Sequence, residues 1–329
     1  MNTTASRPVS EAPAVESARR ATPERILQRI DWQVIRRLDG LLQGDYRSLF
    51  YGYGIDFADL REYQPEDDVR YIDWNVTARM DSPYVRQYVE DREISAWFLL
   101  DLSPSMDFGA ALHGVDGLKR GALINFVATF ARLLTRHGNR VGALFYSGKP
   151  APGGKNTAPA IERTIPPRGG RVQVLHLLND LLQQPQLPRA PFTNLTPMFE
   201  SSLHAIKKRS LVFILSDFIS EPGWERPLRL LAHRHEVLGV RIWDPREMEL
   251  PDAGPVVLED SETGEQLVVD TSDKKFRARF AEAAHRRENE LRTTFKQSGV
   301  DLLSLSTEDD LVRAIVRLAE LRKQRRAHR

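Results

Sequence analysis

Short apolar runs of strand length alternate with helix-length amphipathic segments from residue 93 to the C-terminus, and this alternation limits the possible folds most strongly. A run that is apolar at nearly every position is typical of a strand covered on both faces, as in a parallel sheet. Strands that alternate with helices favour a doubly wound arrangement. We therefore predict an α/β fold with a doubly wound, mostly parallel sheet, whose strands include residues 94–100, 141–146, 211–216, 237–243 and 300–305.

The sequence pattern divides the chain into three parts. Residues 1–23 mix Thr, Ser, Ala and Pro with charged residues, which predicts a disordered tail. Residues 24–92 form a predicted N-terminal lobe, in which an apolar-striped helix ending near Gly44 precedes a small β lobe. Residues 93–329 form the predicted sheet domain with its C-terminal helix. Within it, two apolar runs flank Glu262-Thr-Gly264, and this pattern predicts a β-hairpin insertion.

Composition argues against several classes of protein. The chain has no cysteine, so a disulfide framework and a thiolate metal site are excluded. A net charge of +2 is too small to favour nucleic-acid binding. No apolar run approaches the roughly 18–20 residues that span a bilayer, and the N-terminus lacks the apolar core of a secretory signal. We expect a cytoplasmic protein that neither spans a membrane nor binds nucleic acid.

Oxygen-bearing side chains follow two of the predicted strands. Asp101-Leu-Ser103-Pro-Ser105 comes directly after the first buried run, and Asp217 follows the strand at residues 211–216. Ligands of open α/β sheets bind beyond the carboxyl ends of the strands, so these residues form a candidate site. Carboxylate and hydroxyl oxygens are hard ligands that suit Mg²⁺ or Mn²⁺.

The alternative interpretation is that these residues only cap helices and turns. A third oxygen-rich segment, the loop that carries Thr193 and Thr196, shows the same ambiguity. Thr196 precedes Pro197, and a Thr ahead of a Pro is typical of the N-cap of a helix.

The set formed by Asp101, Ser103, Ser105, a Thr and Asp217 resembles the metal-ion-dependent adhesion site of von Willebrand factor A domains. The resemblance implies a Rossmann-type fold and a divalent cation ligated by the Ser and Thr hydroxyls, with the two Asp residues acting mainly through water. It also implies an open coordination position that a carboxylate of a partner fills. The family favours Thr193 as the third hydroxyl, and Thr196 remains the rival.

A second resemblance covers the block from Phe57 to Arg79, which is similar to the signature of domain-of-unknown-function family fifty-eight. Proteins of that family are associated with MoxR-type AAA ATPases, so the resemblance implies an adaptor that helps such an ATPase to assemble or mature a target. We predict that the block is a docking surface, because Trp and Arg are the residue types that anchor interfaces. The alternative is a rigid lobe of ion pairs. The candidate docking residues are Arg61, Asp68, Arg70, Trp74 and Arg79.

Motifs for catalysis are missing from the sequence. It contains neither G-x-x-x-x-G-K-[ST] nor G-x-S-x-G, so P-loop hydrolysis and a serine-hydrolase elbow are not expected. We predict a cation-binding protein-interaction module and not an enzyme. Two alternatives stay open: a Mg²⁺-dependent hydrolase, for which Asp107 is the nearby candidate base, and a structural protein with a degraded site.

Overall fold

A six-stranded sheet forms the centre of the computed structural model, which describes residues 22–41, 59–65, 67, 69, 72–80, 82–87, 94–109, 118–150, 159–185 and 193–327. The strand order is β10-β7-β6-β3-β4-β5. The strands are β3 (Ser95–Asp101), β4 (Arg140–Pro150), β5 (Pro159–Arg168), β6 (Leu211–Ser216), β7 (Glu236–Trp243) and β10 (Asp301–Ser306). Neighbouring strands are parallel except for β4 and β5, in agreement with the predicted mostly parallel sheet.

The antiparallel edge strand β5 was not predicted from the sequence. Its prolines, Pro159, Pro166 and Pro167, disguise the alternation that marks a strand. Proline cannot donate a hydrogen bond to a neighbouring strand, and it is therefore tolerated at an edge, where β5 lies.

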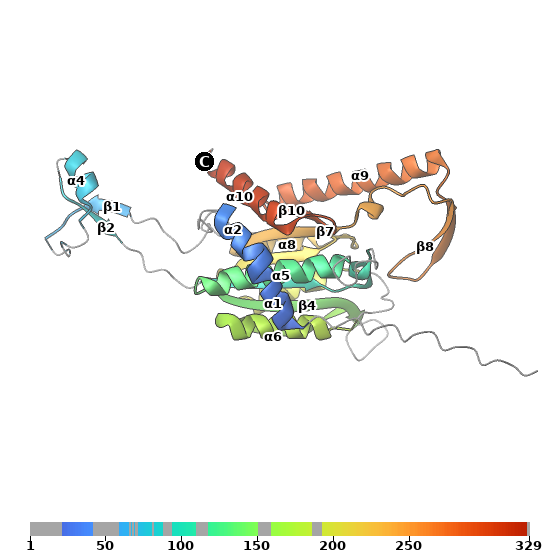
Figure 1. The fold of residues 1–329 in the computed structure, drawn as a ribbon, viewed down its shortest axis with the longest axis horizontal. Coiled ribbons are helices and arrows are strands. Elements are labelled where there is room, and N and C mark those ends of the chain that lie inside the picture. The colour runs from blue at the N-terminus through green and yellow to red at the C-terminus, as the bar shows by residue number, and fades with distance from the viewer. Residues whose placement is uncertain are drawn as a thin grey trace, which may run out of the picture.

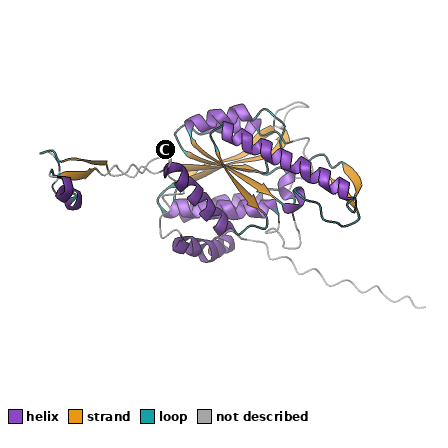
Figure 2. Cartoon of the chain, turned by 90° about the horizontal axis from the view of Figure 1, so that it is seen from above, coloured by secondary structure: helices purple, strands orange, loops and turns teal. Residues whose placement is uncertain are grey.

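Helices cover both faces of the sheet, as Figure 2 shows from above. One face packs against α5 (Lys119–Arg136), α6 (Gly170–Gln183) and α10 (Leu311–Ala327). The other face packs against α7 (Thr196–Ala205), α8 (Glu225–Arg234) and α9 (Lys274–Gln297). The result is a three-layer α/β fold of the doubly wound type.

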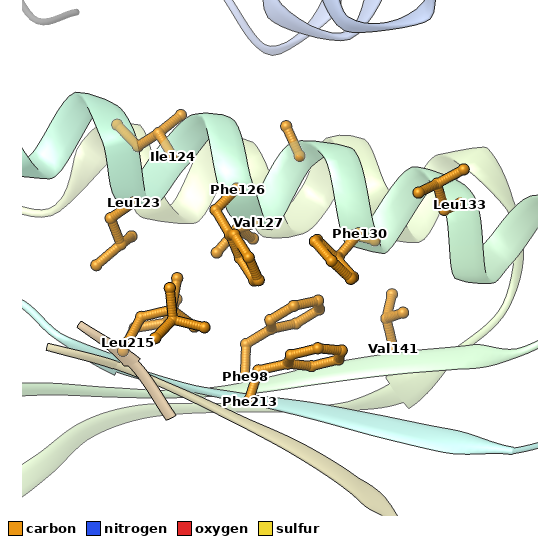
Figure 3. Packing of buried hydrophobic residues seen from close by; sticks show 14 of the residues in the cluster. Phe98, Leu123, Ile124, Phe126, Val127, Phe130, Leu133, Val141, Phe213 and Leu215 are labelled. Carbon is orange, nitrogen blue, oxygen red and sulfur yellow. The ribbon is translucent and has the colours of Figure 1, made fainter. Parts of the chain in front are cut away.

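Successive side chains of the central strands point to opposite faces, because the strand has a period of two. Phe98 of β3 faces α5, whereas Trp97 faces the layer that contains α7 and α8. On the α5 face, Phe98 stacks on Phe213 with ring centroids 5.1 Å apart, and Phe130 lies 5.1 Å from Phe213 (Figure 3). This aromatic packing fixes β3 and β6 side by side beneath α5.

The N-terminal helical segment joins the sheet domain, which differs from the predicted division of the chain. It consists of α1 (Pro23–Ile30), a π-helical turn (Asp31–Ile35) and α2 (Arg36–Leu41), and Figure 1 shows α1 beside α5. The apolar stripe of this segment is part of the α5 core. Arg29 also donates to Asn125 at 2.7 Å, and Arg132 pairs with Asp31 at 2.8 Å. The helix that we assigned to the lobe at residues 24–92 therefore belongs with residues 93–329. An apolar stripe shows that a helix has a buried face, but not what covers that face.

Two small elements lie outside the sheet. β1 (Asp59–Glu62) and β2 (Tyr84–Gln87) pair antiparallel, with α4 (Trp74–Met80) between them in the chain. β8 (Pro255–Glu259) and β9 (Gln266–Asp270) form an antiparallel hairpin that directly precedes α9, as predicted around Glu262 (Figure 1). None of the helices in the described ranges is long and apolar enough to cross a membrane. The tail predicted at residues 1–23 lies outside the described residues, except for the last two.

Candidate functional site

The candidate site lies where the chain path reverses across the sheet. β3 and β6 are neighbours, and the chain continues from β3 to β4 on one side and from β6 to β7 on the other. The loops at the carboxyl ends of β3 and β6 therefore diverge, which creates the crevice where ligands bind in open α/β sheets. Asp101 is the last residue of β3, and Asp217 directly follows β6.

The carboxylate of Asp101 is completely buried and is held by two donors. Its Oδ1 accepts a hydrogen bond from the backbone N–H of Ser103 at 3.0 Å, and its Oδ2 accepts one from Ser216 Oγ at 2.6 Å. Burial, reinforced by the charge of Asp217, raises the pKa of Asp101 to about 6. The bond to Ser216 ties the ends of β3 and β6 together, although the two residues are 115 positions apart.

The segment after Asp101 places two hydroxyl groups next to each other. A 3-10 helix, Pro104–Asp107, follows Ser103, and the Oγ atoms of Ser103 and Ser105 lie 3.1 Å apart in the buried site. Arg120 of α5 donates hydrogen bonds to both carboxylate oxygens of Asp107, from Nε to Oδ1 at 2.5 Å and from Nη2 to Oδ2 at 3.1 Å. This bidentate pair fixes the turn against α5.

Asp217 is neutralised by a buried lysine that sequence analysis did not identify. Lys119 Nζ donates to Asp217 Oδ2 at 2.7 Å and to Glu247 Oε1 at 2.6 Å, while Ile219 N donates to Asp217 Oδ1 at 2.9 Å. Burial alone would lower the pKa of Lys119, but the charges of Asp217 and Glu247 outweigh burial and raise this pKa. One signal was present in the sequence: Lys119 lies in the first turn of α5, where the helix dipole disfavours a cation unless anions face it.

The residue after Asp217 has a strained backbone. Phe218 has a φ of 58°, a left-handed conformation that is unusual for a bulky side chain. Its N–H donates to Ser216 Oγ at 2.9 Å, and its ring packs edge-on against Phe295 with centroids 5.0 Å apart. The surrounding packing therefore holds this turn in a costly conformation directly beside the site.

The structure brings Thr193, and not Thr196, to this cluster. Thr193 is buried. Glu221 N donates to the carbonyl oxygen of Thr193 at 3.0 Å, and this bond holds the loop that carries Thr193 against the segment after β6. Thr196 is the first residue of α7, and its hydroxyl lies on the side of Gly223. The predicted capping role of Thr196 is not seen either, because Thr196 is already inside α7 and Leu195 stands at the N-cap position without a side-chain cap hydrogen bond.

A third carboxylate enters the cluster from the β8–β9 hairpin. Glu262 Oε1 accepts hydrogen bonds from Thr193 Oγ1 at 2.7 Å and from Ser105 N at 3.3 Å. Burial raises the pKa of Glu262, and the charge of Asp217 adds to this rise. The sequence pattern predicted the hairpin but no role for Glu262, because nothing local shows which surface a hairpin tip faces.

The oxygen atoms of this cluster fit a hard divalent cation in their chemistry. Within the described ranges, no group of three or more His, Asp or Glu side chains has the arrangement of a metal site. A cation would therefore depend on the hydroxyls of Ser103, Ser105 and Thr193 together with the aspartates. One buried oxygen, Glu262 Oε2, has no hydrogen-bond partner in the described part of the chain. A buried acceptor of this kind calls for a missing donor or cation.

The predicted docking residues are described only in part. Trp74 is 69% exposed on α4, and Arg79 is also exposed on that helix. The side chain of Arg61 in β1 lies outside the described residues, as do Asp68 and Arg70. An exposed Trp on a small element is a common feature of an interface.

The comparisons with known proteins identify the family. The chain belongs to the family described as Protein of unknown function DUF58, whose model matches residues 59–290. A Mycobacterium tuberculosis protein described as uncharacterized is 37% identical over 299 residues, which cover 91% of this chain and 89% of that protein. A Mycobacterium avium protein with the same description is 35% identical over 160 residues, covering 49% of this chain and 94% of that protein.

Solved structures with a similar arrangement include two from Bacteroides. The conserved hypothetical protein BatB from Bacteroides thetaiotaomicron is 13% identical, with a TM-score of 0.41, and the match covers 70% of this chain and 99% of that chain. An aerotolerance-related membrane protein from Bacteroides fragilis is 12% identical, with a TM-score of 0.40 and the same coverage.

Proposed function

We propose that this protein is a von Willebrand factor A-like interaction module that binds Mg²⁺ or Mn²⁺ and grips a protein partner without catalysis. One observation carries the proposal: residues far apart in sequence meet at the carboxyl ends of β3 and β6 and are all buried there. They are Asp101, Ser103, Ser105, Thr193 and Asp217. A lone capping turn would not collect hydroxyls and carboxylates from three separate loops.

A divalent cation at this cluster would supply positive charge and an open position for a partner's carboxylate. Hydrogen bonds within the chain hold the residues around that position. Ser216 bonds to Asp101, and Lys119 bonds to Asp217. The N–H of Glu221 bonds to the carbonyl oxygen of Thr193. The candidate base of the alternative hydrolase is engaged elsewhere, since Arg120 holds both oxygens of Asp107. The geometry therefore favours binding over hydrolysis.

The partner that we propose is a MoxR-type AAA ATPase, with this protein acting as a cytoplasmic adaptor in the assembly or maturation of a target. The support is the resemblance of the block from Phe57 to Arg79 to MoxR-associated proteins, together with the exposure of Trp74 and Arg79 on α4. The proposed cation site and α4 would then provide two separate contact surfaces.

Calorimetric titration of Mg²⁺ and Mn²⁺ tests the cation site with two matched variants. Thr193→Val removes one buried hydroxyl from the cluster, and Thr129→Val removes one from α5, where Thr129 Oγ1 donates to the carbonyl of Asn125 at 2.8 Å. We expect Thr193→Val to weaken cation binding by about tenfold or more, since loss of ligand-sphere groups has effects of this size. Thr129→Val should bind as the unmodified protein does.

The proposal fails if the unmodified protein binds neither cation, or if Thr193→Val binds as tightly as Thr129→Val. Thermal unfolding of both variants shows whether either change has disturbed the fold. A purified MoxR-type ATPase, titrated with and without a chelator, then tests whether the cation contributes to binding of the partner.

A further inference from the structure

The hairpin formed by β8 and β9 delivers a carboxylate to the hydroxyl of Thr193, which the proposed cation needs, and to the backbone N–H of Ser105. Glu262 Oε1 contacts both Thr193 Oγ1 and Ser105 N, although these partners lie 69 and 157 residues away in sequence. Both contacts converge on one oxygen atom. Glu262 therefore lies against two residues of the cluster that would bind the proposed cation.

The tip of the hairpin is shaped to present this residue. Asp260 Oδ1 accepts hydrogen bonds from the N–H groups of Glu262 and Thr263 at 2.8 and 2.9 Å, and Gly264 completes the turn with a φ of 73°. A left-handed residue at that position is tolerated without strain only because it is glycine. The turn thus fixes the backbone of Glu262 before its side chain enters the site.

The strands of the hairpin are poorly covered by the rest of the protein. Val257, Leu267 and Val268 are 58%, 61% and 74% exposed, whereas Val269, near the base, is buried. An isolated two-stranded hairpin is only marginally stable in water, so the contacts of its tip weigh heavily in its position. The hydrogen bonds of Glu262 to Thr193 and Ser105 are therefore the main described contact between the tip and the sheet domain.

Two features of the Glu262 contact are energetically unfavourable without a cation. Glu262 brings a negative charge close to Asp217, and its second oxygen is buried without a hydrogen-bond partner in the described residues. Like charges that share a buried site repel each other, and an unfilled buried acceptor costs further free energy. A divalent cation would offset both costs.

We propose that Glu262 is an internal ligand of the cation site, which occupies the position of a partner's carboxylate until that partner displaces the β8–β9 hairpin. This inference rests on the proposed function, because it assumes that the cluster binds a divalent cation. It adds two features: the site is self-occupied in the free protein, and the partner must offer an acidic segment that competes with the hairpin tip.

The test compares Glu262→Gln with Glu265→Gln. The first substitution keeps an oxygen that can accept both hydrogen bonds and removes only the charge, and the second makes the same change at an exposed position of the same turn. Calorimetry with Mg²⁺ should show binding weakened about tenfold in Glu262→Gln and unchanged in Glu265→Gln. A purely hydrogen-bonding role for Glu262 would leave the affinity of Glu262→Gln unchanged and would overturn the inference.

A second measurement uses a cyclised, fluorescently labelled peptide with the sequence of residues 255–270, followed by anisotropy at saturating Mg²⁺. A tethered carboxylate acts at roughly millimolar effective concentration, so the internal Glu262 should shield the site from the peptide. We expect Glu262→Gln to bind the peptide at least tenfold more tightly than the unmodified protein and Glu265→Gln. A peptide carrying Gln in place of Glu262 should not bind to any of the three proteins.

The outcomes separate the two proposals. If all three proteins bind Mg²⁺ equally and the peptide does not distinguish them, the internal ligand is refuted and the cation site stands. If none of them binds Mg²⁺, the proposed function and the inference fall together. Hydrogen exchange across residues 255–270 gives an independent readout: Mg²⁺ should slow exchange in the unmodified protein and Glu265→Gln, but not in Glu262→Gln.

Discussion

Replacing Lys119 with Met should destabilise this protein severely, because Lys119 is the buried cation that separates two carboxylates. Its side chain is 0% exposed, and its Nζ atom bonds to Asp217 at 2.7 Å and to Glu247 at 2.6 Å. Met has a similar length and no charge. The substitution would remove the cation that bonds directly to both carboxylates, and that of Asp217 is itself almost fully buried.

The size of the effect follows from these two bonds. A hydrogen bond to a charged group contributes about 1.5–3 kcal/mol, so losing both would cost about 3–6 kcal/mol. Removing one partner of a buried ion pair costs about 3–5 kcal/mol in measured cases. We expect the free energy of unfolding to fall by about 3–5 kcal/mol, which is a large share of the roughly 5–15 kcal/mol that keeps a domain folded.

Urea unfolding followed by tryptophan fluorescence measures this loss without a cation present. Lys207→Met is the matched control, since Lys207 is exposed and surface substitutions usually change stability by less than about 0.5 kcal/mol. Mg²⁺ should restore part of the stability of Lys119→Met, because a ligand that binds only the folded state stabilises it. A loss below about 1 kcal/mol would refute the reasoning, since Asp217 and Glu247 would then not depend on Lys119.

Two further predictions concern other regions. His235 is buried, and neither of its ring nitrogens has a hydrogen-bond partner among the described residues. Burial, and then the charges of Arg234 and Arg209, lower the pKa of His235. The unfolded chain therefore takes up a proton near pH 6.5 before the folded protein does, and stability should fall as the pH drops below that value. His235→Leu should show a smaller fall in chemical denaturation between about pH 7 and pH 5, and equal falls would contradict this assignment. Trp74→Ala should weaken binding to the MoxR-type ATPase by about 2 kcal/mol in a titration, whereas Trp32→Ala, at an equally open position, should not; equal losses would remove α4 from the interface.

Local pattern was sufficient for most of the regular elements, with the proline-containing edge strand β5 as an exception. Local signals set the bounds of α9, because Asp273 caps its start and Gly299, with a φ of 69°, follows its end. The end of the strand at Asp101 and the strand before Asp217 were also predicted from local pattern. An apolar run followed by polar residues marks the end of a buried strand.

Long-range placement could not be predicted in the same way. The apolar stripe of the predicted N-terminal helix, which ends near Gly44, indicated a helix but not its partner, and the structure packs this segment against α5 instead of the N-terminal lobe. The choice between Thr193 and Thr196 also needed the path of the loop, since Thr193 lies just before α7 and Thr196 is its first residue, and this spacing does not show which hydroxyl faces the site.

The sequence by itself determined the alternation of strands and helices, the turn that carries Asp101, Ser103 and Ser105, and the existence of the β8–β9 hairpin. Periodicity and turn chemistry act over a few residues, so a single segment contains the information. Only the tertiary structure decided that Lys119 neutralises Asp217 and that Glu262 reaches Thr193. These contacts join residues 98 and 69 positions apart, and they depend on the order of the strands and the path of the hairpin, which no local pattern records.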